Sequence, residues 1–197
     1  MKHLSLITLV IAIVFAVVST VASAALLNAG FEANTGDGGS ADNWTSDAMG
    51  TEAWGWHSGD WGMTINSWGD VVSGNTYQTV AVADGTDCDY SIWARNEGSS
   101  AGNYYMSLAW YNGATLVDTT SQNIATSADW TEYNLSTVAP TGIDSVQVTF
   151  GASGVNAVGM FDDADFEAAA VPEPASLLLL ASGLLGLFGI SRKKQYL

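Results

Sequence analysis

Aromatic side chains interleaved with polar ones are the residues of this chain best suited to bind a ligand. The sequence contains 8 Trp and 7 Tyr in 197 residues, a heavy aromatic content for its length. Flat rings cover the apolar faces of sugar rings, and polar neighbours form hydrogen bonds with the hydroxyl groups. The outward positions of predicted strands and a Trp pair in a loop therefore give the candidate carbohydrate-binding residues Trp54, Trp56, Trp93, Arg95, Tyr105, Tyr111 and Gln147.

Two of these assignments have structural alternatives. Trp54 and Trp56 are two residues apart, so their side chains could point the same way and stack on a ligand together. They could equally close one end of the fold. Arg95 is the sole cation of the central region, so it could instead pair with a nearby carboxylate.

Groups suited to catalysis are few. His57 is the only imidazole outside the first few residues, and Cys88 lies between Asp87 and Asp89, whose charges raise the pKa of a thiol. No Gly-x-Ser-x-Gly motif, zinc-ligand spacing or phosphate-binding glycine loop is present. A Ser-His-Asp set stays arithmetically possible, which leaves a hydrolase as a remote alternative. The sequence predicts a protein without catalytic activity.

Short alternating runs separated by Gly, Asn, Asp and Ser predict the elements that carry these residues. We expect strands at 63–65, 80–82, 90–95, 104–111 and 146–150, and a hairpin turn at Asn112–Gly113. No convincing helical period occurs between residues 25 and 170. Many short strands with regular turns are typical of an all-β sandwich or barrel.

Parity separates the two faces of each predicted strand, because successive side chains point to opposite sides. The core-facing set is Tyr90, Ile92, Ala94, Tyr104, Met106, Leu108, Trp110, Val146, Val148 and Phe150. The remaining positions predict one amphipathic outer face that carries Trp93, Arg95, Tyr105, Tyr111 and Gln147.

Residues 1–24 have the features of a signal peptide. A basic Lys2 precedes an apolar run from Leu4 to Val18, and Ala22-Ser-Ala24 is a small-x-small cleavage pattern. A retained membrane helix is the alternative.

The other end of the chain predicts a transmembrane helix. Pro172-Glu173-Pro174 is followed by an apolar run from Ala175 to Ile190 and then by the basic residues Arg192, Lys193 and Lys194. Basic residues stay on the cytoplasmic side, so the preceding domain is expected outside the membrane.

This order of Pro-Glu-Pro, apolar helix and basic tail resembles the PEP-CTERM sorting tail, over residues 171–197. The resemblance implies a Gram-negative bacterium that makes exopolysaccharide, and processing near Pro-Glu-Pro by an exosortase. The protein would be membrane-anchored before processing and would then belong to the cell surface or to the extracellular matrix of a biofilm. A simple membrane anchor is the alternative.

The region between the two ends is strongly acidic. Four of the five Lys and Arg residues lie in the ends, as does one of the 20 acidic residues, so the remainder has a net charge of −18. Nucleic-acid binding needs clustered Lys and Arg and is therefore excluded. The single Cys allows no intrachain disulfide.

Several motifs of residues 25–170 resemble the jelly-roll carbohydrate-binding modules, which are galactose-binding-like β-sandwiches. They are the opening Asn28-Ala-Gly-Phe-Glu32, the central Tyr90-Ser-Ile-Trp-Ala-Arg95, and the closing Met160-Phe-Asp-Asp-Ala-Asp165. The resemblance implies a jelly-roll fold and places Trp44 and Trp130 in its core.

The same resemblance implies a structural Ca²⁺ that joins the first and last strands. Its ligands would be the side chains of Glu32, Asp60 and Asp162 and the backbone carbonyls of Gly30 and Trp61. Asp163 or Asp165 could replace Asp162. Oxygen ligands from distant segments suit Ca²⁺. Ordinary solvated carboxylates are the alternative.

Together these features predict an exported, exosortase-sorted protein whose β-sandwich binds polysaccharide without catalysis. The alternative is a purely structural surface or matrix protein of the same fold with no sugar site.

Overall fold

The computed structural model describes residues 24–66, 71–97, 101–125 and 127–169, which fold into ten β-strands. The strands are β1 (Thr45–Asp47), β2 (Gly50–Glu52), β3 (Gly62–Asn66), β4 (Val71–Ala81), β5 (Asp87–Asn96), β6 (Asn103–Asn112), β7 (Thr115–Ile124), β8 (Thr131–Val138), β9 (Ser145–Val155) and β10 (Val158–Ala168).

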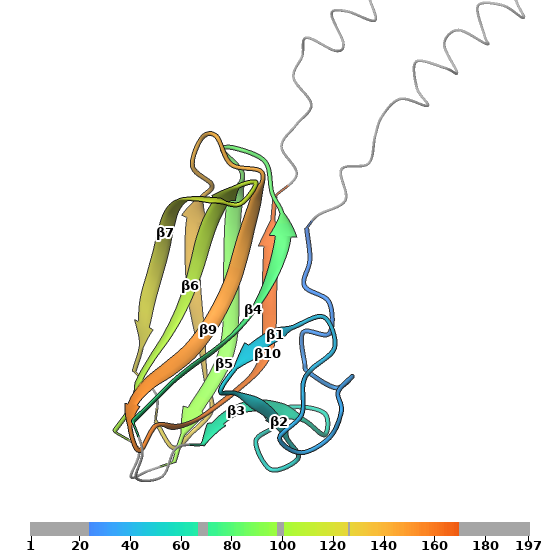
Figure 1. Cartoon of the computed structure of the whole chain (residues 1–197), viewed down its shortest axis with the longest axis vertical. Coiled ribbons are helices and arrows are strands. Elements are labelled where there is room, and N and C mark those ends of the chain that lie inside the picture. The colour runs from blue at the N-terminus through green and yellow to red at the C-terminus, as the bar shows by residue number, and fades with distance from the viewer. Residues whose placement is uncertain (1–23, 67–70, 98–100, 126, 170–197) are drawn as a thin grey trace, which may run out of the picture. The chain divides into compact units, whose positions relative to one another are not determined.

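The strands form two five-stranded antiparallel sheets that pack face to face (Figure 1). The first sheet has the order β1-β4-β9-β6-β7, and the second has the order β2-β3-β10-β5-β8. From β3 to β10 the chain changes sheet at every connection except the hairpin from β6 to β7. The predicted all-β sandwich is confirmed. The predicted transmembrane helix within 171–197 lies outside the described residues, as does the predicted signal peptide at 1–24 except for Ala24.

Within the described residues, no helix is long and apolar enough to cross a membrane.

The predicted core sets are confirmed, since every one of their side chains is at most 3% exposed. Phe31, from the opening motif, packs on Trp44 and Phe150 with ring centroids 5.2 and 5.6 Å apart. Tyr90 crosses the core from the second sheet and donates a hydrogen bond to the Thr149 carbonyl of the first. Burial raises the pKa of Tyr90 well above its ordinary value. The two sheets are therefore joined by rings as well as by aliphatic side chains.

The predicted turn at Asn112–Gly113 is present, whereas strand β7 has no counterpart among the predicted strands. Gly113 and Gly85 both have positive φ, 57° and 67°, at the turns after β6 and β4. Strand β7 lies at the edge of the first sheet, and nearly all of its residues are exposed. Because an edge strand buries little on either face, its sequence lacks the alternation from which strands are predicted.

The prediction of one shared outer face is wrong. Strand β5, which carries Trp93 and Arg95, belongs to the second sheet, whereas β6 and β9 belong to the first. The alternation along each strand correctly predicts that these side chains face away from the core. It does not say to which sheet a strand belongs. The five predicted sugar-binding residues on strands therefore lie on two opposite outer faces.

Candidate functional site

The outer face of the first sheet carries Tyr105, Tyr111 and Gln147. Tyr105 and Tyr111 lie on β6 and face outward together, and the six residue steps from one to the other span about 20 Å along the strand. Gln147 lies opposite Ala109 of β6 and Thr79 of β4. Register adds a third tyrosine, Tyr77 of β4, opposite Thr149. Sequence analysis missed Tyr77 because only the end of β4 was recognised as a strand.

Gly151 of β9 allows the Tyr105 ring to lie against the sheet. The two residues are register partners, and a Cβ at position 151 would lie 2.8 Å from the Tyr105 hydroxyl. The ring therefore occupies the space that any larger residue would need. Partial burial raises the pKa of the Tyr105 hydroxyl.

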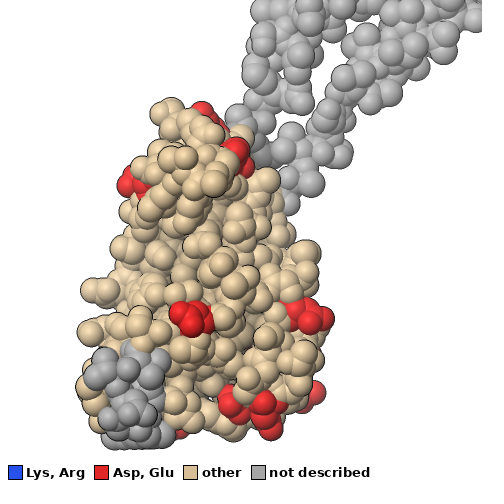
Figure 2. Space-filling model, viewed as in Figure 1, with Lys and Arg blue, Asp and Glu red and all other residues tan. Residues whose placement is uncertain are grey.

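The centre of this face is polar but uncharged. Strands β4, β9 and β6 contain no Asp, Glu, Lys or Arg, although the domain is strongly acidic. Most of their outward positions carry Ser, Thr, Asn, Gln or Tyr, and the others carry Gly, Ala or Val. In Figure 2 uncharged atoms cover most of the visible side, acidic groups are scattered, and no Lys or Arg is seen. The face thus combines aromatic rings with neutral hydrogen-bonding groups.

The outer face of the second sheet has a different character, because aromatic side chains there stack on one another. The His57 ring lies on Trp93 with centroids 4.0 Å apart and planes 11° apart. His57 also meets Trp130 edge-on at 5.4 Å. One face of Trp93 is therefore already covered by the protein. The expected core position of Trp130 is wrong, since this residue is partly exposed outside the sheet, whereas Trp44 is buried as expected.

Arg95 lies beside this aromatic cluster. Its guanidinium is 5.3 Å from the centroid of the Trp130 ring. Among the described residues, its buried Nε has no hydrogen-bond partner, and the one ion pair found there joins His57 and Asp163. Pairing of Arg95 with a nearby carboxylate, the structural alternative, is thus not observed within that part of the chain.

Trp54 and Trp56 project from the segment between β2 and β3, residues 53–61, hereafter the β2–β3 loop. Their side chains are 43% and 46% exposed. The Trp54 indole donates a hydrogen bond to Glu52. Both rings therefore face solvent and do not close the end of the sandwich core.

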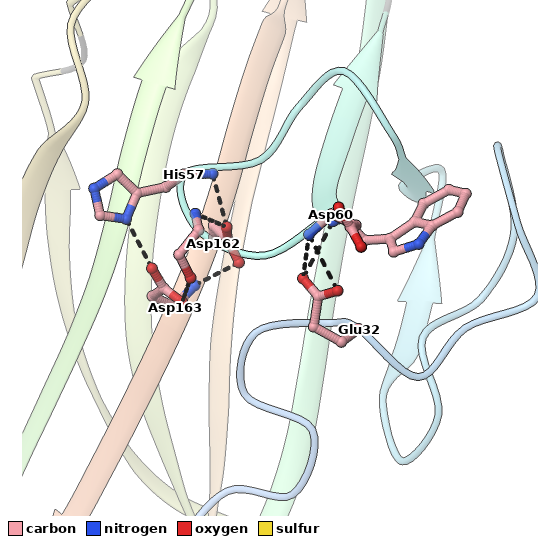
Figure 3. A network of polar contacts seen from close by, with 7 residues as sticks. Glu32, His57, Asp60, Asp162 and Asp163 are labelled. Carbon is pink, nitrogen blue, oxygen red and sulfur yellow. Dashed lines mark hydrogen bonds and ion pairs between the residues drawn. The ribbon is translucent and has the colours of Figure 1, made fainter.

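Two carboxylates hold the β2–β3 loop by its backbone amides (Figure 3). Glu32 accepts hydrogen bonds from the N–H groups of Asp60 and Trp61 at 3.0 and 3.1 Å. Asp162 accepts those of His57 and Ser58 at 2.7 and 3.0 Å. Because both carboxylates come from distant segments, they tie the loop to the opening segment and to β10.

The side chain of Asp163 extends this network. Its carboxylate bonds the His57 Nδ1 and the Ser58 hydroxyl, both at 2.7 Å. The backbone N–H of Asp163 in turn donates to Asp162. Asp162 is fully buried, and burial is the main cause that raises its pKa to about 6. A charged Asp162 is therefore costly unless further positive charge compensates it.

The residues expected to bind calcium meet in this corner. A Cβ on Gly30 would lie 3.5 Å from an Asp163 oxygen and 4.0 Å from an Asp162 oxygen, and Glu32 holds Asp60 and Trp61. These oxygens are of the kind that calcium prefers. However, the described residues contain no group of three or more His, Cys, Asp or Glu arranged to hold a metal ion. Calcium binding thus stays a prediction.

The groups considered for catalysis lie apart. Cys88 is buried in the core, and burial, followed by the charges of Asp89 and Asp87, raises its pKa to about 11. His57 is occupied by Trp93 and Asp163. Cys88 therefore lacks the surroundings of an activated nucleophile. The bond to Asp163 orients the His57 imidazole as in a general base, but among the described residues no hydroxyl or thiol is hydrogen-bonded to its Nε2.

Comparison with known proteins identifies the carboxyl end. Residues 170–193 match the PEP-CTERM protein-sorting motif. The match includes Pro172, Glu173, Pro174, Arg192 and Lys193, all outside the described residues, and ends before Lys194. The motif implies an exported, exosortase-sorted protein of the cell surface. Among curated proteins, no sequence matches the chain.

Several solved structures share the fold. A family 16 carbohydrate-binding module is 16% identical with a TM-score of 0.57, over 71% of this chain and 96% of that module. TmCBM61 in complex with β-1,4-galactotriose is 17% identical with a TM-score of 0.54, over 73% of this chain and 97% of that one. The enzymatically active domain of bacteriophage CBA120 tailspike protein 4 is 14% identical with a TM-score of 0.61, over 73% of this chain but only 21% of that one.

A xylan-binding CBM22 domain of Paenibacillus barcinonensis Xyn10C and a cyclase from Fischerella sp. TAU have the same fold as well. At these identities the likeness shows the fold alone, and the fold is shared by binding modules and by enzymes. The chain therefore carries a PEP-CTERM sorting motif behind a β-sandwich that resembles carbohydrate-binding modules.

Proposed function

We propose that the exported β-sandwich binds a neutral polysaccharide along the outer face of its first sheet, without catalysis. The observation that carries this proposal is the absence of charge from β4, β9 and β6 in an otherwise acidic domain. Solubility alone would favour charged side chains on so large a surface. A face that instead combines Tyr with Ser, Thr, Asn and Gln suits the mixed apolar and hydroxyl surface of a neutral sugar.

Tyr77, Tyr105 and Tyr111 would contact the apolar faces of sugar rings, and Gln147 would bond hydroxyl groups. The extent of the face supports a chain ligand, because Tyr105 and Tyr111 are about 20 Å apart along β6. The crossing of the chain between sheets after most strands supports the jelly-roll connection found in carbohydrate-binding modules. A purely structural surface protein would show no affinity for any polysaccharide.

Affinity electrophoresis of the full chain in detergent against neutral and acidic polysaccharides tests the proposal. We expect at least one neutral polymer to retard the protein, and Tyr111→Ala to weaken that retardation about tenfold. Asn134→Ala, on the exposed side of β8 in the other sheet, is the matched control. Unchanged mobility in every neutral polymer, or equal retardation of Tyr111→Ala and wild type, would refute the proposal.

We also propose the corner of Gly30, Glu32, Asp60, Trp61 and Asp162 as the place of the calcium ion. A buried carboxylate with a raised pKa, together with oxygens from segments about 130 residues apart, supports this assignment. Calcium would supply the positive charge that Asp162 lacks. An ion at 100 times its dissociation constant adds about 2.7 kcal/mol to the free energy of unfolding. A melting temperature that is equal in calcium and in chelator would show that the amide bonds alone hold the loop.

A further inference from the structure

Arg95 is an unusual cation for this domain. It is the only Lys or Arg between residues 25 and 170, where acidic residues are abundant. Even so, no described carboxylate forms a salt bridge with it. Its Nε is buried and lacks an acceptor among the described residues. A buried donor without a partner destabilises a fold. The terminal N–H groups of Arg95 are not among the buried atoms without a partner, and no described residue accepts a hydrogen bond from them, so they are the donors that an external acceptor would meet.

The groups around Arg95 hold it in one orientation. On β10 its register partner is the apolar Met160, and on the other side Trp130 precedes β8 and lies beneath the guanidinium. Trp130 is supported in turn by the edge of His57, which Asp163 and Trp93 fix. The guanidinium therefore lies between apolar walls, where its interaction with an anion is stronger than in open water.

The nearby acidic side chains are engaged elsewhere or do not pair with Arg95. Asp162 accepts three amide hydrogen bonds, and Asp163 bonds His57 and Ser58. Glu132 lies opposite Trp93 on β8, and Glu97 follows β5, but neither is in a salt bridge with Arg95. A rigid guanidinium without a carboxylate partner presents its planar N–H donors to a ligand.

We propose that Arg95 and Trp130 form a second site, which binds the carboxylate of an acidic sugar unit. Arg95 donates hydrogen bonds to the carboxylate, and the exposed part of Trp130 contacts the sugar ring. The site is separate from the face that binds neutral polysaccharide, because it lies on the opposite sheet. The choice of a sugar acid rests on the proposed function, whereas the choice of a carboxylate rests on the geometry of Arg95.

A matched pair of polymers isolates the carboxylate. One is a polyuronate, and the other is the same polymer with its carboxyl groups reduced to alcohols. Binding of the full chain in detergent to each is measured by affinity electrophoresis at 0.15 M salt, where charges beyond about 8 Å are screened. We expect Arg95→Gln to weaken binding to the polyuronate at least tenfold. Arg95→Lys keeps the charge but not the planar fork, so we expect an intermediate loss.

Three results would overturn the proposal. The first is equal binding of wild type and Arg95→Gln to the polyuronate. The second is equal binding of wild type to the polyuronate and to its reduced form. The third is an affinity for poly-glutamate that matches the affinity for the polyuronate, which would assign the site to acidic peptides. Tyr111→Ala distinguishes a failure of this proposal from a failure of the proposed neutral-polysaccharide site. We expect Tyr111→Ala to weaken binding to neutral polymers. In that background Arg95→Gln should still weaken binding to the polyuronate.

Spectroscopy of Arg95 adds a readout that loss of folding would not imitate. The Nε–H signals of the full chain come from Arg95 and Arg192 only, and Arg95→Lys assigns them. We expect the Arg95 signal to shift on titration with the uronate oligosaccharide and to stay unchanged with the reduced one. A shift with neither ligand contradicts the proposal.

Discussion

Replacing His57 by Ala tests whether the β2–β3 loop is anchored on the second sheet through this ring. The substitution removes the stack on Trp93, at 4.0 Å and 11°, and the 2.7 Å bond from Nδ1 to Asp163. An aromatic pair contributes about 1 kcal/mol beyond its area and a hydrogen bond contributes about as much. The His57 side chain is 27% exposed, so these figures apply without a large discount for solvent. We expect His57→Ala to lower the free energy of unfolding by about 2 kcal/mol.

For a domain of this size, 1 kcal/mol corresponds to a change of about 2–4 °C in melting temperature. The expected decrease for His57→Ala is therefore about 4–8 °C, measured by differential scanning calorimetry. His57→Phe keeps the ring stack and loses the bond to Asp163, so about half of that decrease is expected. Asn134→Ala, on an exposed position of the same sheet, is the control for nonspecific effects.

Two results would refute this reasoning. A decrease below about 1 °C for His57→Ala would mean that the carboxylates hold the loop without help from the ring. A decrease for His57→Phe as large as that for His57→Ala would mean that the stack on Trp93 contributes nothing. Acrylamide quenching gives independent support, because uncovering Trp93 increases the accessibility of the tryptophans as a set.

Other expectations follow from single residues. Gly151→Ala would press a methyl group against the Gly74 carbonyl and the Tyr105 hydroxyl, so it should lower the melting temperature and weaken retardation by a neutral polysaccharide in affinity electrophoresis. Cys88, whose pKa is raised to about 11, should resist iodoacetamide at pH 8 until the protein is unfolded; rapid alkylation of the folded protein would contradict its burial. Asp162 has its pKa raised mainly by burial, from an ordinary 3.8 to about 6, so the folded state binds the extra proton between these values. In chelator, its contribution to the free energy of unfolding should therefore fall by about 2 kcal/mol from pH 4 to pH 7, a slope that Asp162→Asn should lack.

How far the fold could be predicted depended on what each strand buries. Strands β5, β6 and β9 pack one complete face against the core, and their alternation was legible in the sequence. Strand β7 is exposed on nearly every residue, and β1 and β2 have only three residues each, so none of them carries a period. Strand β10 contains a register shift between Asp162 and Asp165, which interrupts the alternation just where the loop carboxylates are needed.

The candidate site was predictable in its residues but not in its arrangement. Local alternation correctly predicts the outward direction of Trp93, Arg95, Tyr105 and Tyr111. The direction of a side chain depends only on the strand in which the residue lies. Sheet membership depends on pairings between strands far apart in the chain, such as β6 with β9, and no local pattern encodes them. The stack of His57 on Trp93 likewise joins a loop and a strand 36 residues apart.

The separation of the two faces gives the acidic charge a physical role. Acidic residues are absent from the central strands β4, β6 and β9 of the first sheet, whose edge strands carry Asp47 and Asp118, but they occur on β5, β8 and β10. Repulsion between domains therefore acts mainly through the second sheet, the edges of the first sheet and the loops. A neutral polysaccharide can approach the three central strands of the first sheet, which contain no charged residue. An acidic sugar, in contrast, meets repulsion everywhere on the second sheet except where Arg95 stands over Trp130. The acidic charge would then restrict acidic ligands to one position, the site of Arg95 and Trp130.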